Sequence, residues 1–280
     1  MIEPGSTLGH FRVLQQIGSG GMGTIFCALD TLLHRKVALK IIHQHLLKKR
    51  GGVAAFQKEA ATQAQLIHPN IVSLYAFVVL ENHYVMVMEY VEGSSLRDIL
   101  RDRGPLPLGE ALLAMKQLLR GLRYAHGMQI IHRDIKPGNL IRTRAGQLKI
   151  SDFGIAAVAG VLPEPGREGI MGTPWYASPE QISGQPVDHR SDLFSAGVTL
   201  YEMLTGEIPF DAHAWDPADT SRWLAGISAP QPPSARVARI PGVLDDFVLK
   251  SIRRRPEERF QDAGDMLSIL DGIQLEVAGR

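Results

Sequence analysis

Apolar and polar residues alternate with the period of β-strands through most of the first third of the chain. Strand-like runs separated by glycines cover 11–42, and two more runs follow at 71–79 and 84–89. Between them, residues 53–67 carry apolar positions at helical spacing, which His68-Pro69-Asn70 interrupts. The pattern predicts a small antiparallel sheet accompanied by one main helix.

Helical spacing dominates the chain after residue 92. Two long loops rich in glycine and proline, 163–179 and 229–241, interrupt it, and loops of this length commonly carry function. The sequence therefore predicts an α+β protein, in which a β-rich part is followed by a larger, mainly α part. The five expected helices are 95–103, 108–127, 192–204, 244–253 and 263–272.

The composition is that of a globular chain without a strong charge preference. Its 280 residues are 45% hydrophobic, and 30 basic against 29 acidic residues give a net charge of +1, so nucleic acid is not an expected partner. No apolar run approaches the roughly 20 residues that span a bilayer, and residues 1–5 lack the pattern of a secretion signal. The single cysteine, Cys27, excludes an internal disulfide, and a cytoplasmic location is expected.

A glycine-rich string lies between the first two predicted strands. Residues 18–23 match GxGxxG and are followed by Ile25. Alone, this string also fits a flexible hairpin or a dinucleotide-binding turn. A dinucleotide site needs a helix after the glycines, whereas 24–29 has the pattern of a strand. The glycines are therefore expected to cap a β-hairpin whose backbone can approach phosphate oxygens.

Lys40 lies on the next predicted strand, directly after the apolar residues 37–39. A lone lysine on a strand is usually a solvated edge residue. Glu59 on the predicted helix changes this interpretation, because an ion pair with Glu59 would hold Lys40 against the α and β phosphates of a nucleotide.

The strongest signal is the string His132-Arg133-Asp134-Ile135-Lys136-Pro137-Gly138-Asn139, with Ser151-Asp152-Phe153-Gly154 beginning twelve residues after the asparagine. These residues resemble the catalytic and magnesium-binding loops of the protein kinase superfamily, in particular the bacterial eukaryotic-like (Hanks-type) serine/threonine protein kinases. The resemblance covers about residues 11–270.

The resemblance implies a bilobal protein kinase fold, with a small antiparallel β lobe carrying one main helix and a larger, mainly α lobe. It makes 1–280 a single catalytic domain, with the N-lobe at 11–91, the C-lobe at 92–272 and the activation segment at 152–180. It further implies transfer of the γ-phosphate of ATP to serine or threonine hydroxyls of proteins in bacterial signalling.

Phosphoryl transfer depends on positioning and on neutralising charge. By resemblance, Asp134 orients the hydroxyl and accepts its proton, while Asn139 and Asp152 hold the metal. Lys136 and Lys40 offset phosphate charge. The expected cofactors are ATP and Mg²⁺, with Mn²⁺ as the alternative metal.

The resemblance also assigns a nucleotide pocket. Met88 is expected at its back, the Glu89 carbonyl and the Val91 amide at the adenine edge, and Ser95 at the ribose. The alternative is that the apolar members are ordinary core. The complete expected set is Ile17, Gly18, Ser19, Gly20, Gly21, Met22, Gly23, Thr24, Ile25, Ala38, Lys40, Met88, Glu89, Val91, Ser95, Lys136, Asn139, Ile141 and Asp152.

Residues 171–180 resemble the end of an activation segment, the platform for a peptide substrate. Thr173 is expected to tie Asp134 to Lys136, a feature similar to serine/threonine rather than tyrosine kinases. Ser178 stands where relatives more often have alanine, and this substitution is expected to have little effect. His132 invites interpretation as a general base, but the resemblance makes it structural.

The activation segment lacks a site for activating phosphorylation, because no serine, threonine or tyrosine lies between Ile155 and Gly172. Kinases with arginine before the catalytic aspartate are commonly phosphorylated within this segment, and the phosphate then contacts that arginine, here Arg133. We expect Glu164 or Glu168 to supply the anion, or a partner to order the segment.

Two buried anchors are expected in the larger lobe. Asp192 would hydrogen-bond the catalytic-loop backbone, and Arg259 would pair with Glu180. The alternative for each is a surface ion pair of less than about 1 kcal/mol.

Two further residues bear on regulation and specificity. Gln63, one turn after Glu59, is polar where relatives often have an apolar contact, so the helix is expected to be less secure without a partner. Gly138, like Ser95, occupies a position where kinases that prefer arginine upstream of the target carry glutamate, so a preference for basic substrates is not expected.

Two other functions stay open: a pseudokinase scaffold that binds ATP, and a small-molecule kinase of the aminoglycoside type. The filled catalytic positions argue against the first, and the activation segment with Arg259 argues against the second. A protein substrate is the expected partner, with a homodimer or an activating partner as further alternatives.

Overall fold

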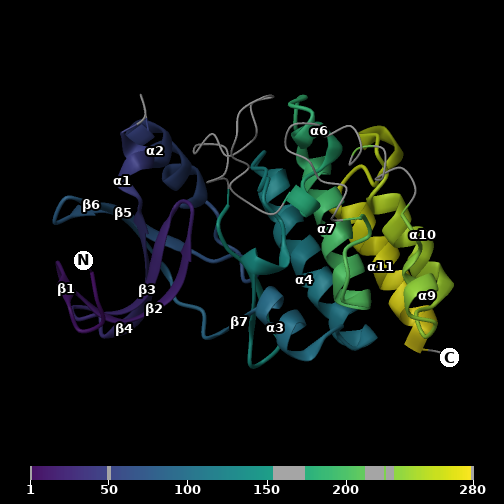
Figure 1. Ribbon diagram of the computed structural model, residues 1–280, viewed down its shortest axis with the longest axis horizontal. Coiled ribbons are helices and arrows are strands. Elements are labelled where there is room, and N and C mark those ends of the chain that lie inside the picture. The colour runs from purple at the N-terminus through teal and green to yellow at the C-terminus, as the bar shows by residue number, and fades with distance from the viewer. Residues whose placement is uncertain (1, 49–51, 154–173, 212–223, 225–229, 279–280) are drawn as a thin grey trace.

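The chain builds a β-rich part and a helical part that lie side by side (Figure 1). The computed structural model describes residues 2–48, 52–153, 174–211, 224 and 230–278. The predicted α+β class, with the sheet part first and the helical part second, is confirmed.

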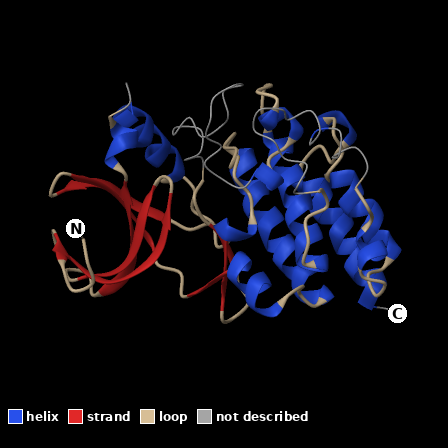
Figure 2. Cartoon of the chain, in the orientation of Figure 1, coloured by secondary structure: helices blue, strands red, loops and turns tan. Residues whose placement is uncertain are grey.

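Six antiparallel strands form the larger sheet, in the order β1-β2-β3-β4-β6-β5. The sheet curls on itself, and helix α2 lies across one side of it (Figure 2). The strands are β1 (Thr7–Leu8), β2 (Phe11–Gly20), β3 (Gly23–Asp30), β4 (Arg35–Ile42), β5 (Leu74–Leu80) and β6 (His83–Glu89), and the helices of this part are α1 (Gln44–Leu47) and α2 (Gly52–Gln63).

Strand β4 is buried on both faces, which explains its unbroken apolar sequence. Val37 and Leu39 point into the curl of the sheet, while the alternate residues Ala38 and Ile42 pack with α2. Lys40 shares the second face by the same alternation, so the strand carries this lysine beneath the helix rather than at an exposed edge.

A second, three-stranded sheet joins the two parts, in the order β7-β8-β9 (Figure 2). Ile71 bridges to Ile150 on its last strand, which ties the chain before β5 to this junction. The strands of this sheet are β7 (Gly93–Ser95), β8 (Leu140–Thr143) and β9 (Leu148–Ile150).

The helical part contains α3 (Leu96–Arg103), α4 (Leu108–Gly127), α6 (Pro179–Ile182), α7 (His189–Thr205), α9 (Pro233–Arg236), α10 (Gly242–Ser251) and α11 (Ala263–Ala278). It also contains the 3₁₀ turns η1 (Pro137–Asn139), η2 (Pro174–Tyr176) and η4 (Pro256–Glu258).

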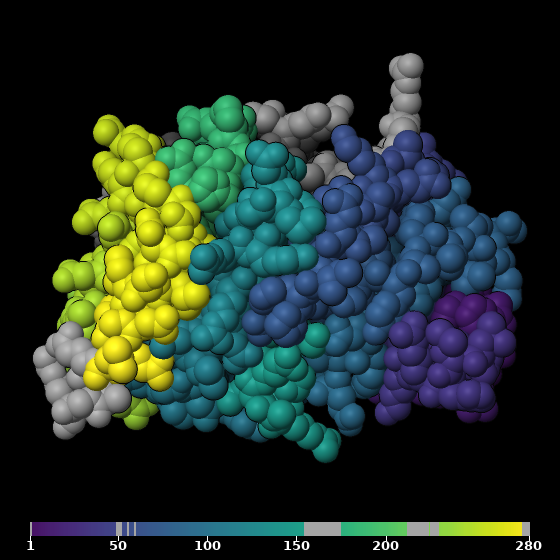
Figure 3. Space-filling view, turned by 180° about the vertical axis from the view of Figure 1, so that it is seen from behind, coloured from purple at the N-terminus to yellow at the C-terminus, as the bar shows by residue number. Residues whose placement is uncertain are grey.

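Helix α7 is the centre of the helical part. Most of its side chains are buried, as expected for a helix surrounded by others. Gly197 lets it approach α10 closely, because a Cβ there would stand 2.5 Å from the Cβ of Ser251. On the opposite face of the molecule α11 lies against α4 (Figure 3), where Lys116 pairs with Asp271 at 2.5 Å. None of the helices in the described residues combines the length and hydrophobicity needed to cross a membrane.

Several predicted boundaries differ from the observed ones. The helix predicted over 53–67 ends at Gln63, because the Leu66 N–H donates to the Gln63 carbonyl in a tighter turn. The strand predicted from 71 begins at Leu74, since 71–73 bond to other partners. Helix α4 has the predicted bounds.

Arg259 and Glu180 form the expected buried pair. The two guanidinium NH groups donate to the two carboxylate oxygens at 2.7 Å each, and both residues are almost completely buried. Arg259 also donates to the carbonyls of Arg253 and Arg254, so its N–H groups are satisfied. Burial opposes ionisation of Glu180, but the hydrogen bonds and charge of Arg259 outweigh it and lower the pKa of Glu180. The prediction is confirmed, and the surface alternative is wrong.

Replacing Arg259 by methionine should destabilise the fold by about 3–5 kcal/mol, because Glu180 would be left as a buried unpaired charge. Arg255→Met is the matched control. Its partner Glu258 is 4.0 Å away and both are exposed, so its loss should cost less than about 1 kcal/mol. Urea unfolding at neutral pH measures both, and equal losses would contradict the structure.

The same comparison has a defined pH dependence. Because the folded protein lowers the pKa of Glu180, the pair contributes its full stability above the unfolded pKa of about 4.3 and loses it as pH falls through the lower folded pKa. The difference between wild type and Arg259→Met should therefore shrink below about pH 4.

Gln63 is buried without hydrogen bonds. It is 1% exposed, and neither its Oε1 nor its Nε2 has a partner within the described part of the chain. Gln63→Met, which keeps the shape and removes the polar atoms, should stabilise the protein by about 1–3 kcal/mol. Gln57→Met, on the exposed side of the same helix, should change little. A loss of stability in Gln63→Met, measured by thermal unfolding, would mean that the amide is bonded.

Candidate active site

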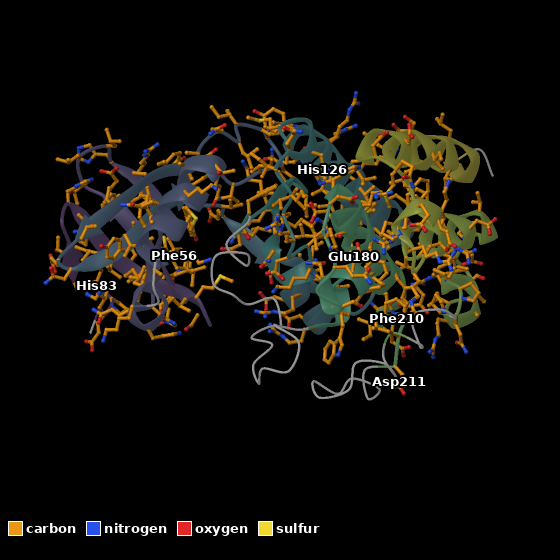
Figure 4. All side chains as sticks on the ribbon, turned by 90° about the horizontal axis from the view of Figure 1, so that it is seen from above. Phe56, His83, His126, Glu180, Phe210 and Asp211 are labelled. Carbon is orange, nitrogen blue, oxygen red and sulfur yellow. The ribbon has the colours of Figure 1, made fainter. Side chains whose placement is uncertain are left out.

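Asp192, in the first turn of α7, holds the loop that carries the predicted catalytic residues. It is fully buried and accepts the backbone N–H groups of His132 and Arg133 at 2.8 Å each, together with His126 Nε2 at 2.8 Å. Burial opposes its ionisation, but the hydrogen bond and charge of His126 and the backbone donors outweigh this and lower the pKa of Asp192. The predicted contact between Asp192 and the loop backbone is confirmed. Both His126 and Glu180 lie in the helical part (Figure 4).

The loop needs this support because its backbone is strained. Arg133 has φ of 67°, in the left-handed region that side chains with a Cβ seldom adopt. Its N–H is bound by Asp192, and its carbonyl accepts Gln181 Nε2 at 2.9 Å. Gln181 itself is fixed by the capping box that Ser178 makes at the start of α6. The Ser178 side chain therefore takes part in the contacts that hold Gln181, and the expectation that serine in place of alanine has little effect stays a prediction.

His132 has no nitrogen available for proton transfer. Its Nδ1 accepts the N–H of Asp134 at 3.2 Å, so the proton is on Nε2, which donates to the Ser151 carbonyl at 2.8 Å. The ring is fully buried and lies 4.5 Å from that of Phe153. The geometry supports the structural interpretation of His132 and argues against a general base.

Asp134 is held by two neighbours on the same loop. Lys136 Nζ donates to both of its carboxylate oxygens at 2.8 Å. Asn139 Nδ2 donates to its carbonyl at 2.8 Å and to Oδ2 at 2.9 Å. A carboxylate fixed from two sides presents an accepting oxygen in one orientation, and it remains partly exposed.

Asp152 and Lys40 face each other across the junction of the two parts and form an ion pair. The Asp152 backbone is left-handed, with φ of 61°, and Ser151 before it bonds to the Asn139 carbonyl at 2.9 Å. Burial opposes ionisation of Asp152, but the charge and hydrogen bond of Lys40 outweigh it and lower its pKa. The Glu59 side chain, the expected partner of Lys40, lies outside the described residues.

The expected adenine contacts form one apolar cluster. Ala38 and Met88 are directly opposed in neighbouring strands, and Ile25, Val91 and Ile141 pack with them. Met22 joins the same cluster, whereas Ile17 is 44% exposed on β2. The structure thus brings together most of the apolar residues that were expected to contact adenine, although they come from strands far apart in the chain. Ile17 is not part of this cluster.

The glycines of the hairpin between β2 and β3 differ in the space around them. A Cβ on Gly23 would stand 2.3 Å from the Ile41 carbonyl, so this glycine is required by the close approach of the hairpin to β4. A Cβ on Gly20 would meet nothing within 4 Å, and one on Gly18 only Ile25 at 3.7 Å. These two leave open space at the hairpin end, where a phosphate chain could approach the backbone.

Two other pocket residues have additional partners. The Ser95 hydroxyl caps α3 by accepting the Asp98 N–H at 3.1 Å, and it donates to the Asp98 carboxylate at 2.5 Å. The Glu89 carboxylate pairs with Lys149 at 2.8 Å. The spacing Ser-x-x-Asp is a capping signal that could have been read from the sequence. The ribose contact of Ser95 and the adenine contact of Glu89 stay predictions.

The residues present fit a magnesium ion shared with phosphates. The Asn139 amide N–H groups both donate to Asp134, so its Oδ1 remains as a possible metal ligand. Asp152 supplies carboxylate oxygens. No group of three or more His, Cys, Asp or Glu residues in the described chain could form a closed metal cage. Magnesium commonly takes one or two protein ligands and completes its shell with phosphates and water.

Some predicted residues fall outside the described part. Thr173, Glu164 and Glu168 are among them, so the expected tie from Thr173 to Asp134 and the expected anions for Arg133 stay predictions. The Arg133 Nε is buried and has no partner in the described residues.

Asp192→Asn should cost about 2–4 kcal/mol of stability, because an amide nitrogen would face backbone N–H donors that it cannot accept. Chemical denaturation measures this cost. The same variant should lower kcat by tenfold or more while Kd for a nucleotide changes little, since the apolar cluster is on other strands. Unchanged stability would contradict the proposed role of the carboxylate.

Comparison with known proteins agrees with this geometry. The family model described as the protein kinase domain matches residues 11–268. The chain is 36% identical over 259 residues to serine/threonine-protein kinase PrkC of Bacillus subtilis and 38% identical over 271 residues to serine/threonine-protein kinase PknB of Mycobacterium leprae. These matches cover 92% and 95% of this chain but only 39% and 43% of the two relatives, so the chain spans about two fifths of their length.

Among solved structures, the kinase domain of Mycobacterium tuberculosis PknI superposes with a TM-score of 0.76 over the whole of both chains, at 24% identity. A second structure of that domain gives 0.75, covering 97% of this chain and 99% of the other. At this identity the likeness establishes the fold alone.

Proposed function

The chain belongs to the protein kinase domain family, and we propose that it transfers the γ-phosphate of ATP to serine or threonine hydroxyls of proteins. One observation carries the proposal. Asp134 is fixed by Lys136 and Asn139, on a loop that ends beside the Lys40–Asp152 pair. In this proposal Asp134 is the proton acceptor, Lys40 and Lys136 are the cations, and Asn139 and Asp152 are the oxygen donors, which is the set that phosphoryl transfer requires.

Each residue has a part in the proposed reaction. Asp134 orients the substrate hydroxyl and accepts its proton as the oxygen attacks the phosphoryl group. Lys136, already bonded to that carboxylate, offsets charge on the transferred group. Lys40 is positioned by β4 to meet the nucleotide phosphates, and Glu59 on α2 is its proposed partner in the active form.

The metal in this proposal is Mg²⁺, held by Asn139 and Asp152, which would neutralise phosphate charge when bound. Oxygen ligands and the absence of a nitrogen or sulfur donor at the two positions support it, and they leave Mn²⁺ as the alternative. The adenine would lie in the apolar cluster of Ala38, Met88 and Val91.

The domain limits and partners belong to the same proposal. Residues 11–91 act as the nucleotide lobe and 92–272 as the substrate lobe, with the activation segment at 152–180. A reaction that consumes ATP and a single cysteine support a cytoplasmic site of action, tethered to the cytoplasmic side of a membrane if the native chain is longer. The buried, unsatisfied amide of Gln63 weakens the packing of α2 and supports control by an activating partner, with a homodimer as the alternative.

Asp134→Asn and Lys40→Met should each lower phosphate transfer by about 100-fold or more, because one removes the proton acceptor and the other a phosphate contact. Transfer of labelled phosphate from ATP with magnesium measures this. Lys36→Met, an exposed lysine on the same strand as Lys40, is the control and should retain transfer.

Label on serine or threonine in wild type, lost in both variants, supports the proposal. Binding of ATP without any transfer would favour the scaffold. Transfer to a small molecule but to no protein would favour the small-molecule kinase.

A further inference from the structure

A pocket of about 300 Å³ lies in the helical part of the protein, and none of the residues assigned to the active site lines it. It forms where the connection from α3 to α4, the C-terminal end of α7 and the connection from α9 to α10 meet. The lining consists of residues 105–108, Leu204, Arg239 and Ile240. The volume is at the lower end of the range for small-molecule pockets and equals the share of about ten water molecules in the liquid.

The walls of this pocket are held by contacts within the chain. The Leu106 N–H donates to the Met203 carbonyl at 2.8 Å, which ties the connection from α3 to α4 onto α7. Gly206 ends α7 in the left-handed conformation, and a Cβ on it would stand 3.1 Å from Pro105 Cγ, so the two segments approach closely. Pro105 and Pro107 restrict φ between the two helices. A ligand therefore meets a preformed wall and loses little affinity to ordering it.

Arg239 is the one polar side chain among the described residues that line the pocket. The other lining side chains are aliphatic, and the two prolines among them also lack a backbone N–H. The pocket therefore offers apolar surface and a single guanidinium, whose planar N–H groups match the two oxygens of a carboxylate. This lining fits a molecule that is apolar along most of its length and anionic at one end.

The Arg239 guanidinium is available to such a molecule. Its side chain is exposed and makes no hydrogen bond or ion pair with any residue that the structure describes. Two carboxylates of the neighbouring segments have other partners. Glu207 pairs with Arg236 at 3.4 Å, and Asp245 accepts the N–H and the hydroxyl of Ser234 at 2.9 and 2.5 Å. An anion in the pocket would thus meet a cation that neither of these carboxylates neutralises.

We propose that this pocket binds a small apolar carboxylate of the fatty-acid type, with its chain against the leucines and its carboxylate on Arg239. The site is separate from the proposed kinase centre and does not depend on that function. The volume limits the ligand to about ten non-hydrogen atoms. The simpler alternative, a solvated arginine beside a surface hollow, predicts no preference for charge or chain length.

The test titrates octanoate, a chain of that size, into the full protein with isotope-labelled leucine and isoleucine methyl groups. The methyl resonances of Leu106, Leu204 and Ile240 should shift and saturate. Hexanoate and butanoate should bind more weakly, by about two- to fourfold for each methylene removed, because less apolar surface is buried. Octylammonium, which has the same chain and a positive charge, should cause no saturable shift of these signals.

Two variants of Arg239 and one control separate the charge from the rest of the pocket. Arg239→Gln should weaken octanoate binding by about two- to fivefold, the value of one exposed ion pair. Arg239→Glu should exchange the preference, so that octylammonium binds and octanoate does not. Arg253→Gln changes another exposed arginine whose side chain has no partner among the described residues, and it should leave octanoate binding unchanged. Because both arginines are exposed, none of these changes disturbs the core.

Saturable shifts of the three methyl signals by octanoate, weakened in Arg239→Gln and retained in Arg253→Gln, support the inference. The absence of saturable shifts, an affinity that Arg239→Gln leaves unchanged, or equal binding of octylammonium overturns it. None of these outcomes bears on phosphate transfer, which the Asp134→Asn comparison tests separately.

Discussion

The buried carboxylate of Asp192 is the interaction on which the rest of the site depends. It binds two consecutive backbone N–H groups of the catalytic loop, and it does so from the first turn of α7, a helix whose side chains are mostly buried. A negative charge at a helix N-terminus is favoured by the helix dipole, and three hydrogen bonds compensate its desolvation. The left-handed backbone of Arg133 persists because this bond and that of Gln181 hold it.

A second buried charge secures the same loop from the other side. Glu180 lies in the first turn of α6 and pairs with Arg259, while its neighbour Gln181 donates to the Arg133 carbonyl. The two carboxylates thus connect α6, α7 and the turn before α11 to the loop, and Asp134 is oriented by residues that themselves cannot move freely. The loop around Asp134 is thus held by buried contacts, whereas the packing of α2 includes the unsatisfied amide of Gln63.

The sequence predicts the parts of this site that lie in short contiguous motifs. The loop residues, the Asp152 string and the two buried anchors could be named because their strings and spacing resemble those of a known family. Helix α4 was also predictable, since its apolar spacing runs without a proline from Leu108 to Gly127 and continues through Gly109 and Gly121.

Features that depend on which segments meet in space were not predictable. The sequence did not predict that Ser178 forms a capping box with Gln181, whose amide donates to the Arg133 carbonyl in the loop. The lack of partners for Gln63 follows from packing, and the pocket at Arg239 exists only because segments far apart in the chain meet there. The exposure of Ile17 likewise reflects the position of β2 rather than its apolar character.

Hydrogen exchange of the His132 and Arg133 amides tests most directly the claim that Asp192 prebuilds the loop. If it does, both amides should exchange as slowly as those in the middle of α7, with protection factors on the order of 10⁴ or more in the nucleotide-free protein. Fast exchange of both amides, while α7 stays protected, would show that the loop opens on its own and would contradict the account.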